Sequence, residues 1–194
     1  MGNVIQAGVG QAPARQASIY AGLPKETVCT TINKVCASGM KAIMMASQSL
    51  MCGHQDVMIA GGMESMSNVP YYLPRGLTEI LFIDIRTFFC SGDTPYGNLQ
   101  LEDGIAKDGL TDAYDRIPMG LCAEKTAKKE GLSRVDQDAY AKQSYERTAK
   151  AWKAGLFNAE IVPVTVTTKK GETVVKEDEE YKKVDFEKMK TVRD

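Results

Sequence analysis

A stretch of small and apolar residues restricts what this chain can fold into more than any other part of its sequence. Between Ala37 and Cys52 such residues lie mostly on every side of a helical projection. A helix without a polar face is one that other elements cover. The sequence therefore predicts a helix that is buried all round, and Gly53 supplies its expected end.

Segments that favour strands precede and follow this predicted helix. Glu26–Thr31 is rich in β-branched residues, and Val57–Ala60 is apolar throughout, as in a buried parallel strand. Gly2–Ala7 predicts an earlier strand, followed by a helix that begins near Pro13 and ends before Gly22. This alternation predicts an α/β fold with a layered sheet, in which sites lie at the carboxyl ends of the strands.

Cys36 stands where the second predicted strand turns into the buried helix. A cysteine in the first turn of a helix faces unpaired N–H groups, which lower a thiol pKa from about 8.5 toward neutrality. The small residues Ala37, Ser38 and Gly39 would let a bulky acyl donor approach it. The alternative is a buried cysteine that serves only as a small apolar side chain.

Composition narrows the classes of partner and compartment. The chain has 194 residues, 43% of them hydrophobic and 25% charged, as in ordinary globular proteins. A net charge of -1 predicts no general attraction to nucleic acid or to anionic membranes, and no apolar stretch is long enough to predict a membrane span. Five cysteines without CxxC pairs predict a reducing compartment rather than a disulfide framework or a zinc site. Met1–Ser18 contains a single basic residue, Arg15, and predicts no signal or transit peptide.

The second half of the chain begins with an interruption and continues with helices and a hairpin. Leu77–Asp93 is strongly apolar and is interpreted either as a loop with its own role or, preferably, as an insertion without one. Met119–Lys129 predicts a helix, and Ser133 with Asp136 imitates a capping box for a longer helix that runs to Gly155. A hairpin is predicted from strands 161–167 and 172–176, and residues 176–183 mix charges as a solvated surface does.

Three sequence strings resemble the thiolase family. They are NKVCASGMKA (33–42), VMIAGGMESMSNVPY (57–71) and MGLCAEKTA (119–127). The likeness covers nearly the whole chain apart from the interruption. It implies a thiolase-type layered α/β fold, with a partial amino-terminal domain at 1–72, an atypical apolar insertion at 73–93 and a loop domain that binds coenzyme A at 94–194.

The same resemblance implies an acyltransferase activity. Thiolases of the short-chain mitochondrial type join two acetyl-CoA molecules into acetoacetyl-CoA and CoA, reversibly, with no tightly bound cofactor and coenzyme A as part of the substrate. Cys36 would then hold the acetyl group as a thioester, which divides one difficult step into two easier ones. A homotetramer and a mitochondrial location are the corresponding expectations.

The family's contacts with coenzyme A carry over onto Tyr145, Lys183, Val184, Asp185 and Lys188. Lys183 stands where the family pattern has arginine, and a lysine cannot stack a planar head on adenine. Tyr145 also resembles an aromatic residue through which the short-chain enzyme responds to potassium. Without the resemblance, Tyr145 would be a helix residue packed near Trp152, and the lysines would be ordinary surface charges.

The residues that complete catalysis in the family have no counterpart in this chain. The family takes them from a second cysteine, a Gly-His-Pro motif and an Asn-Glu motif, whereas the single histidine here, His54, lies about 25 Å along the helix from the thiol. The alternative hypothesis is therefore a catalytically incomplete, truncated isoform that acts only as an acyl-CoA-binding or subunit-interaction module. A ketoacyl synthase is a third, weaker alternative.

Overall fold

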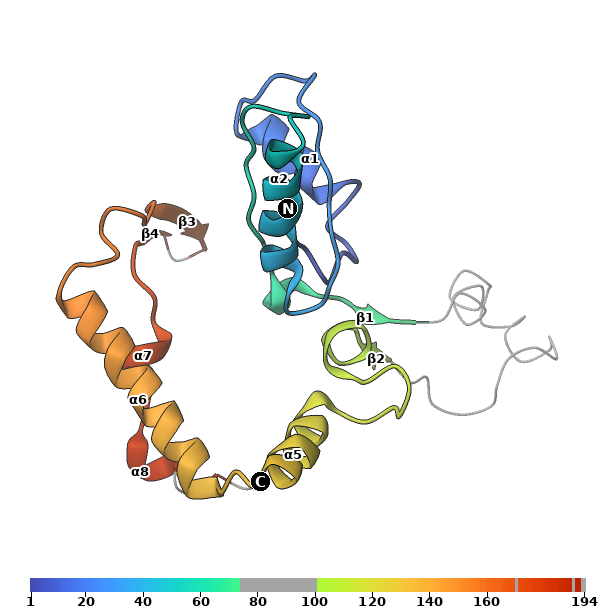
Figure 1. The fold of residues 1–194 in the computed structure, drawn as a ribbon. Helices are drawn as coiled ribbons and strands as arrows, with labels where there is room; N and C mark the ends of the chain where they lie inside the picture. The colour runs from blue at the N-terminus through green and yellow to red at the C-terminus, as the bar shows by residue number, and fades with distance from the viewer. Residues whose placement is uncertain (74–100, 170, 190, 193–194) are drawn as a thin grey trace, which may run out of the picture. The chain divides into compact units, whose positions relative to one another are not determined.

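The computed structural model describes residues 1–73, 101–169, 171–189 and 191–192. Figure 1 draws these residues in colour, and they divide into two compact units, Met1–Cys122 and Ala123–Asp194. Within the described ranges, no helix combines the length and the apolar character needed to cross a lipid bilayer.

Three extended segments run parallel in the first unit, with the amino terminus in the middle. Gly2 forms parallel bridges with Ile32 on one side and with Gly62 on the other. The N–H of Asn3 donates to the carbonyl of Ile32 at 3.0 Å. The parallel arrangement agrees with the expected sheet. The segment of Gly2 lies between the segments of Ile32 and Gly62.

The extent of the three predicted strands was wrong. In the described first unit these segments pair only through single bridges, and the pairing at Ile32 and Gly62 comes just after the predicted strands 26–31 and 57–60. Val57 and Ile59 are 80% and 70% exposed. A strand forms only where a neighbouring backbone can accept and donate hydrogen bonds, and Gly2 offers that neighbour at one point.

Two helices pack beside these segments. Helix α1 is Pro13–Tyr20, with its proline in the first turn as predicted. Helix α2 is Ser38–Met51, within one residue of each predicted end. Both helix predictions are confirmed.

The prediction that α2 is buried all round was wrong. Its buried residues are Ser38, Ala42 and Ala46, which follow one another at a spacing of four and form one narrow stripe. Met40 and Met51 are 69% and 85% exposed. Burial depends on which elements cover a helix, and in the described part of the chain only the small-residue stripe is covered.

Short elements complete the first unit. The antiparallel pair β1 (Tyr71–Tyr72) and β2 (Glu102–Asp103) is preceded by the 3-10 turn η1 (Met66–Asn68) and followed by the π-helical turn η3 (Ala106–Leu110). Residues 74–93 of the predicted apolar insertion lie outside the described residues.

Helices α5 (Met119–Glu130) and α6 (Arg134–Lys153) confirm the predictions made for them. Ser133 and Asp136 form the predicted capping box, in which each side chain accepts a hydrogen bond from the backbone N–H of the other residue. The long helix therefore begins where the sequence signal places it.

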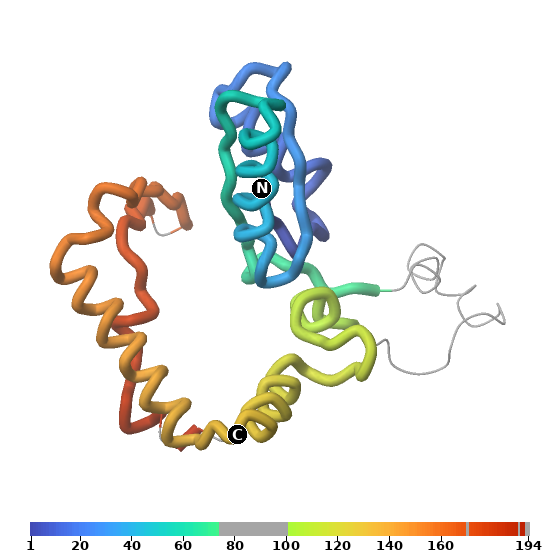
Figure 2. The backbone as a smooth tube through the Cα atoms, in the orientation of Figure 1, coloured from blue at the N-terminus to red at the C-terminus, as the bar shows by residue number. Residues whose placement is uncertain are grey.

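The chain after α6 turns back along this helix, as the tube in Figure 2 shows. The hairpin of β3 (Val164–Thr168) and β4 (Gly171–Val175) confirms the prediction, with Thr168 opposite Gly171. Helices α7 (Glu180–Lys183) and α8 (Phe186–Met189) follow. Aromatic rings join them to α6: Tyr181 stacks on Trp152 with ring centroids 6.2 Å apart.

Candidate functional site

Cys36 is exposed and lies directly ahead of α2. The helix begins at Ser38 with Ala37 as its N-cap, so the cysteine precedes the first turn instead of belonging to it. The sequence placed it one or two residues too far into the helix. Its exposure disagrees with the alternative of a buried packing cysteine.

The residue before the cysteine has a strained backbone. Val35 has a φ of 47°, in the left-handed region that β-branched residues rarely enter. Asn33 holds this turn because its Oδ1 accepts from the N–H of Val35 at 3.0 Å. Ser38 holds it from the other side, donating its hydroxyl to the carbonyl of Val35 at 2.6 Å. The strain therefore persists because neighbouring groups fix the turn.

A pocket of about 350 Å³ opens beside Cys36. Three of its lining residues are glycines, and a Cβ on Gly62 would lie 3.6 Å from the Cα of Gly39. The three glycines contribute only backbone atoms to the wall. The lining residues are Gly2, Val4, Val35, Cys36, Ser38, Gly39, Gly62, Met63 and Glu64.

Glu64 is a carboxylate in this pocket that the sequence reasoning missed. It accepts hydrogen bonds from the N–H groups of Val4 at 2.9 Å and Ile5 at 3.0 Å. The amide of Asn3 donates to the same carboxylate at 3.1 Å. These bonds tie the loop after Gly62 to the amino-terminal segment, which gives Glu64 a positioning role. No local signal could find it, because its partners are about 60 residues away in sequence.

Two backbone donors at the start of α2 are open. The N–H groups of Ala37 and Ser38 are used within the turn, by the carbonyls of Lys34 and Val35. The next two N–H groups, those of Gly39 and Met40, have no acceptor among the described residues. Of these two residues only Gly39 lines the pocket, so its N–H group is the candidate donor to an anion or a polarised carbonyl there.

The other cysteines differ from Cys36 in position. Cys52 is exposed at the far end of α2, whereas Cys29 and Cys122 are half-buried. Cys90 lies outside the described residues. His54 follows Cys52, and its N–H donates to the carbonyl of Ser49, so it belongs to the carboxyl end of the same helix.

The five residues predicted to contact coenzyme A all belong to the second unit, whereas Cys36 belongs to the first. Tyr145 on α6 meets Phe186 on α8 edge to face, with ring centroids 6.4 Å apart. Asp185 caps α8, because its carboxylate accepts from the N–H groups of Glu187 and Lys188 at 3.0 Å each. The structure thus brings Tyr145, Asp185 and Lys188 to one short helix and its partner.

Lys183 and Val184 precede that short helix. The ammonium of Lys183 pairs with the carboxylate of Glu179 at 2.9 Å, and both side chains are largely exposed. Such a pair contributes little to stability. Val184 is half-buried just after α7. Lys183 therefore keeps its charge at the surface, beside an acidic neighbour.

The described residues contain no group of three or more histidine, cysteine, aspartate or glutamate side chains that could hold a metal ion. The contact between Tyr145 and potassium stays a prediction.

Tyr181, one turn before Val184, hydrogen-bonds to Glu177, and this bond raises the pKa of its hydroxyl to about 12.

Comparison with known proteins gives a family match over the whole chain. The model described as "Thiolase, N-terminal domain" matches residues 1–194. The chain is 64% identical over 190 residues to the mitochondrial acetyl-CoA acetyltransferase of Homo sapiens, and 63% identical to that of Mus musculus. Each alignment covers 97% of this chain and 41% of the relative, so the chain spans about two fifths of the length of the curated relatives it matches.

A solved structure has a similar fold. The Acat5 thiolase of Ascaris suum, determined in complex with coenzyme A, matches 99% of this chain and 44% of its own length, with a TM-score of 0.82 and 45% sequence identity. This likeness confirms the predicted layered α/β fold. The expected boundaries at residues 72 and 93 stay predictions.

Proposed function

This chain belongs to the thiolase family, and from that premise we propose that it is the acetyl-accepting part of an acetyl-CoA C-acetyltransferase. In this proposal Cys36 is the nucleophile. The observation that carries it is the exposed Cys36 beside a strained turn, where it lines an open pocket together with three glycines. The similar proteins from Homo sapiens and Mus musculus are named for the same activity.

The proposed step is a transfer of one acetyl group between two sulfur atoms. The Sγ of Cys36 attacks the carbonyl carbon of acetyl-CoA, the bond from that carbon to the CoA sulfur breaks, and the cysteine proton ends on the released CoA. The product is a thioester on Cys36. The N–H group of Gly39, a residue that lines the pocket with Cys36, supports this role, because such donors stabilise negative charge that develops near them.

For coenzyme A, we propose that the contacts come from Tyr145, Lys183, Val184, Asp185 and Lys188 in the second unit. The two lysine ammonium groups supply positive charge for phosphates. Asp185 acts by capping α8, and its hydrogen bond with the N–H of Lys188 helps to fix the position of that lysine. Potassium near Tyr145, a homotetramer and a mitochondrial location belong to the same proposal, and the similar proteins from Homo sapiens and Mus musculus are named mitochondrial.

The second candidate is a module that binds acyl-CoA or a partner subunit without joining two acetyl groups. It is favoured by the position of His54, the single histidine of the sequence. Cys36 precedes α2 and His54 follows it, and a helix of 14 residues is about 21 Å long. This histidine is therefore too far away to act as a base for chemistry at Cys36.

Mass spectrometry of the full chain mixed with acetyl-CoA tests the proposal. We expect one acetyl adduct that Cys36→Ser abolishes and Cys52→Ser preserves, since Cys52 is the matched exposed cysteine at the other end of α2. Acetoacetyl-CoA formed in the same mixture would contradict the second candidate. An adduct that survives in Cys36→Ser would contradict the assignment of the nucleophile.

A further inference from the structure

Helix α8 is too short to be stable by its own hydrogen bonds. It has four residues, Phe186–Met189, whereas isolated helices of fewer than about 12 residues are marginal in water. Its position must therefore come from contacts with other elements. Because α8 carries Lys188 and is capped by Asp185, whatever fixes α8 also fixes two of the residues proposed to contact coenzyme A.

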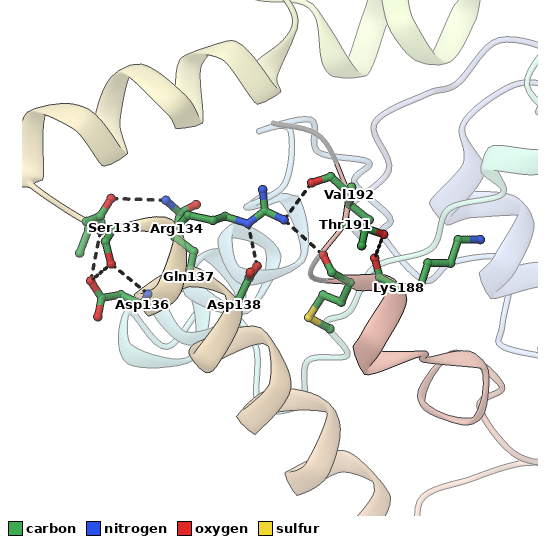
Figure 3. Close-up of polar contacts among 10 residues, drawn as sticks. Ser133, Arg134, Asp136, Gln137, Asp138, Lys188, Thr191 and Val192 are labelled. Atoms are coloured by element: carbon green, nitrogen blue, oxygen red, sulfur yellow. Dashed lines mark hydrogen bonds and ion pairs between the residues drawn. The ribbon is translucent and has the colours of Figure 1, made fainter.

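Arg134 makes the contacts that close the carboxyl end of this segment. Its Nη2 donates to the carbonyl of Met189 at 3.3 Å and to the carbonyl of Val192 at 3.0 Å. These partners are 55 and 58 residues away in sequence. Figure 3 shows the side chain reaching from the first residue of α6 to this backbone, while Lys188 extends away from the guanidinium.

Asp138 orients the guanidinium. The Nε of Arg134 and a carboxylate oxygen of Asp138 are 2.9 Å apart, one helical turn along α6 (Figure 3). Their side chains are 37% and 30% exposed, less than those of the ion pairs Lys129–Glu130, Lys142–Glu146, Lys182–Glu177 and Lys183–Glu179 in the described part of the second unit. With Nε fixed, the planar guanidinium presents Nη2 to the two carbonyls in a defined direction.

The stability of α6 does not explain an arginine at this position. A positive side chain in the first turn opposes the helix dipole, and an arginine placed before an aspartate at this spacing is the weaker order for a helical ion pair. The helix is already capped by Ser133 and Asp136. An arginine is therefore not what the helix alone prefers at this position. Its hydrogen bonds to the carbonyls of Met189 and Val192 offset this cost in stability.

From these contacts we propose that Arg134 is a positioning residue for coenzyme A. It holds residues 185–189 and 191–192 against the start of α6, so that Lys188 is presented to the nucleotide end of the ligand. This inference rests on the proposed function of the second unit. It assigns to Arg134 no contact with the ligand itself.

Coenzyme A binding to the full chain, measured by titration calorimetry, tests the inference with four proteins. We expect Arg134→Gln to weaken binding by about tenfold, since charged hydrogen bonds that order the segment are lost. Asp138→Asn, which keeps the donors but releases their orientation, should weaken it less. Arg147→Gln removes an exposed arginine from the same helix and should leave binding unchanged.

Two further readouts separate positioning from a loss of charge or of folding. Hydrogen exchange of the amides of residues 185–189 should become faster in Arg134→Gln and stay unchanged in Arg147→Gln. Acetylation of Cys36 should slow with acetyl-CoA but not with acetyl-pantetheine, which lacks the nucleotide.

The outcomes distinguish the two proposals. Equal binding by Arg134→Gln and wild type, or equal weakening in Arg134→Gln and Arg147→Gln, would overturn the role of Arg134 while leaving the proposed function intact. Equal slowing with acetyl-CoA and acetyl-pantetheine would also overturn it. Absence of coenzyme A binding by the wild type would overturn the proposed function, and the inference with it.

Discussion

Gly2 lies against the backbone of Ser38 so closely that a Cβ on Gly2 would be 2.5 Å from the carbonyl carbon of Ser38. At this point the amino-terminal segment crosses the start of α2. Gly2 also forms the bridges to Ile32 and Gly62. The same small residue thus allows the helix to approach and joins the three parallel segments.

Alanine at position 2 should destabilise the chain. Gly2→Ala forces Ser38 and its neighbours to shift, which costs about 1–3 kcal/mol. Gly39→Ala is the matched control, because its Cβ would meet the nearest atom of Gly62 at 3.9 Å, an ordinary contact. Urea unfolding should show a lower midpoint for Gly2→Ala only. Similar midpoints for the two variants would contradict the close approach.

Glycine at position 35 should relieve the strained turn. Val35→Gly raises the free energy of unfolding by removing the strain of the left-handed backbone, and lowers it through the greater entropy of the unfolded chain. Val28→Gly is the control. It has only the entropic destabilisation, because Val28 is 85% exposed and is not among the positive-φ residues. We expect Val35→Gly to be the more stable variant by about 1 kcal/mol in thermal unfolding. The reverse order would argue against strain at Val35.

The amino-terminal cap should make the stability of α6 depend on pH in the acid range. Hydrogen bonds from Ser133 lower the pKa of Asp136 below its ordinary value of 3.8. A lowered pKa means that the stabilising contribution is present above pH 3.8 and is lost as the pH falls through the folded-state pKa. Circular dichroism should record this loss in the wild type. Asp136→Asn should show a smaller acid dependence, and an unchanged one would contradict the prediction.

Removing the other half of the cap should cost most above pH 3.8, because the Ser133 hydroxyl also donates to the Asp136 carboxylate and lowers its pKa. Ser133→Ala deletes the hydroxyl that accepts from the N–H of Asp136 at 3.2 Å. We expect about 1 kcal/mol less stability, as for other helix caps. Thr148→Ala, which removes a hydroxyl bonded within the middle of the same helix, is the control and should change stability little.

Tyr181 should lose its hydrogen bond in strong base. The bond to Glu177 raises the pKa of Tyr181 from 10.0 to about 12. The contribution to stability is therefore complete below pH 10 and is lost as the pH rises toward 12. Tyrosinate absorbance, taken as the difference between wild type and Tyr181→Phe, measures this titration. In Glu177→Gln it should move back toward pH 10.

The elements that sequence reasoning predicted correctly are those with local signals. Pro13 marks the start of α1, Ser133 and Asp136 mark the start of α6, and Gly171 follows the hairpin turn with a φ of 118°. Each acts within a few residues of the structure it fixes. The local signal around Cys36 predicted the junction between an extended segment and α2, but it placed the cysteine one or two residues too far into the helix.

What the sequence could not predict depends on distant neighbours. The exposure of α2 is decided by which elements cover it, and the contacts of Glu64 with Ile5 and of Arg134 with Val192 join residues about 60 positions apart. Neither the periodicity of a segment nor its propensities contain that information. The resemblance supplied candidate residues for ligand contact, but not the residues that hold them in place.

The uncovered methionines of α2 determine how this chain will behave in concentrated solution. A formal net charge of -1 gives weak repulsion between molecules, so electrostatics will do little to keep two copies apart. Met40, Met44 and Met51 are 69%, 49% and 85% exposed, and their flexible side chains adapt to many apolar surfaces. We therefore expect the colloidal stability of the purified chain to respond to mild detergent far more than to added salt.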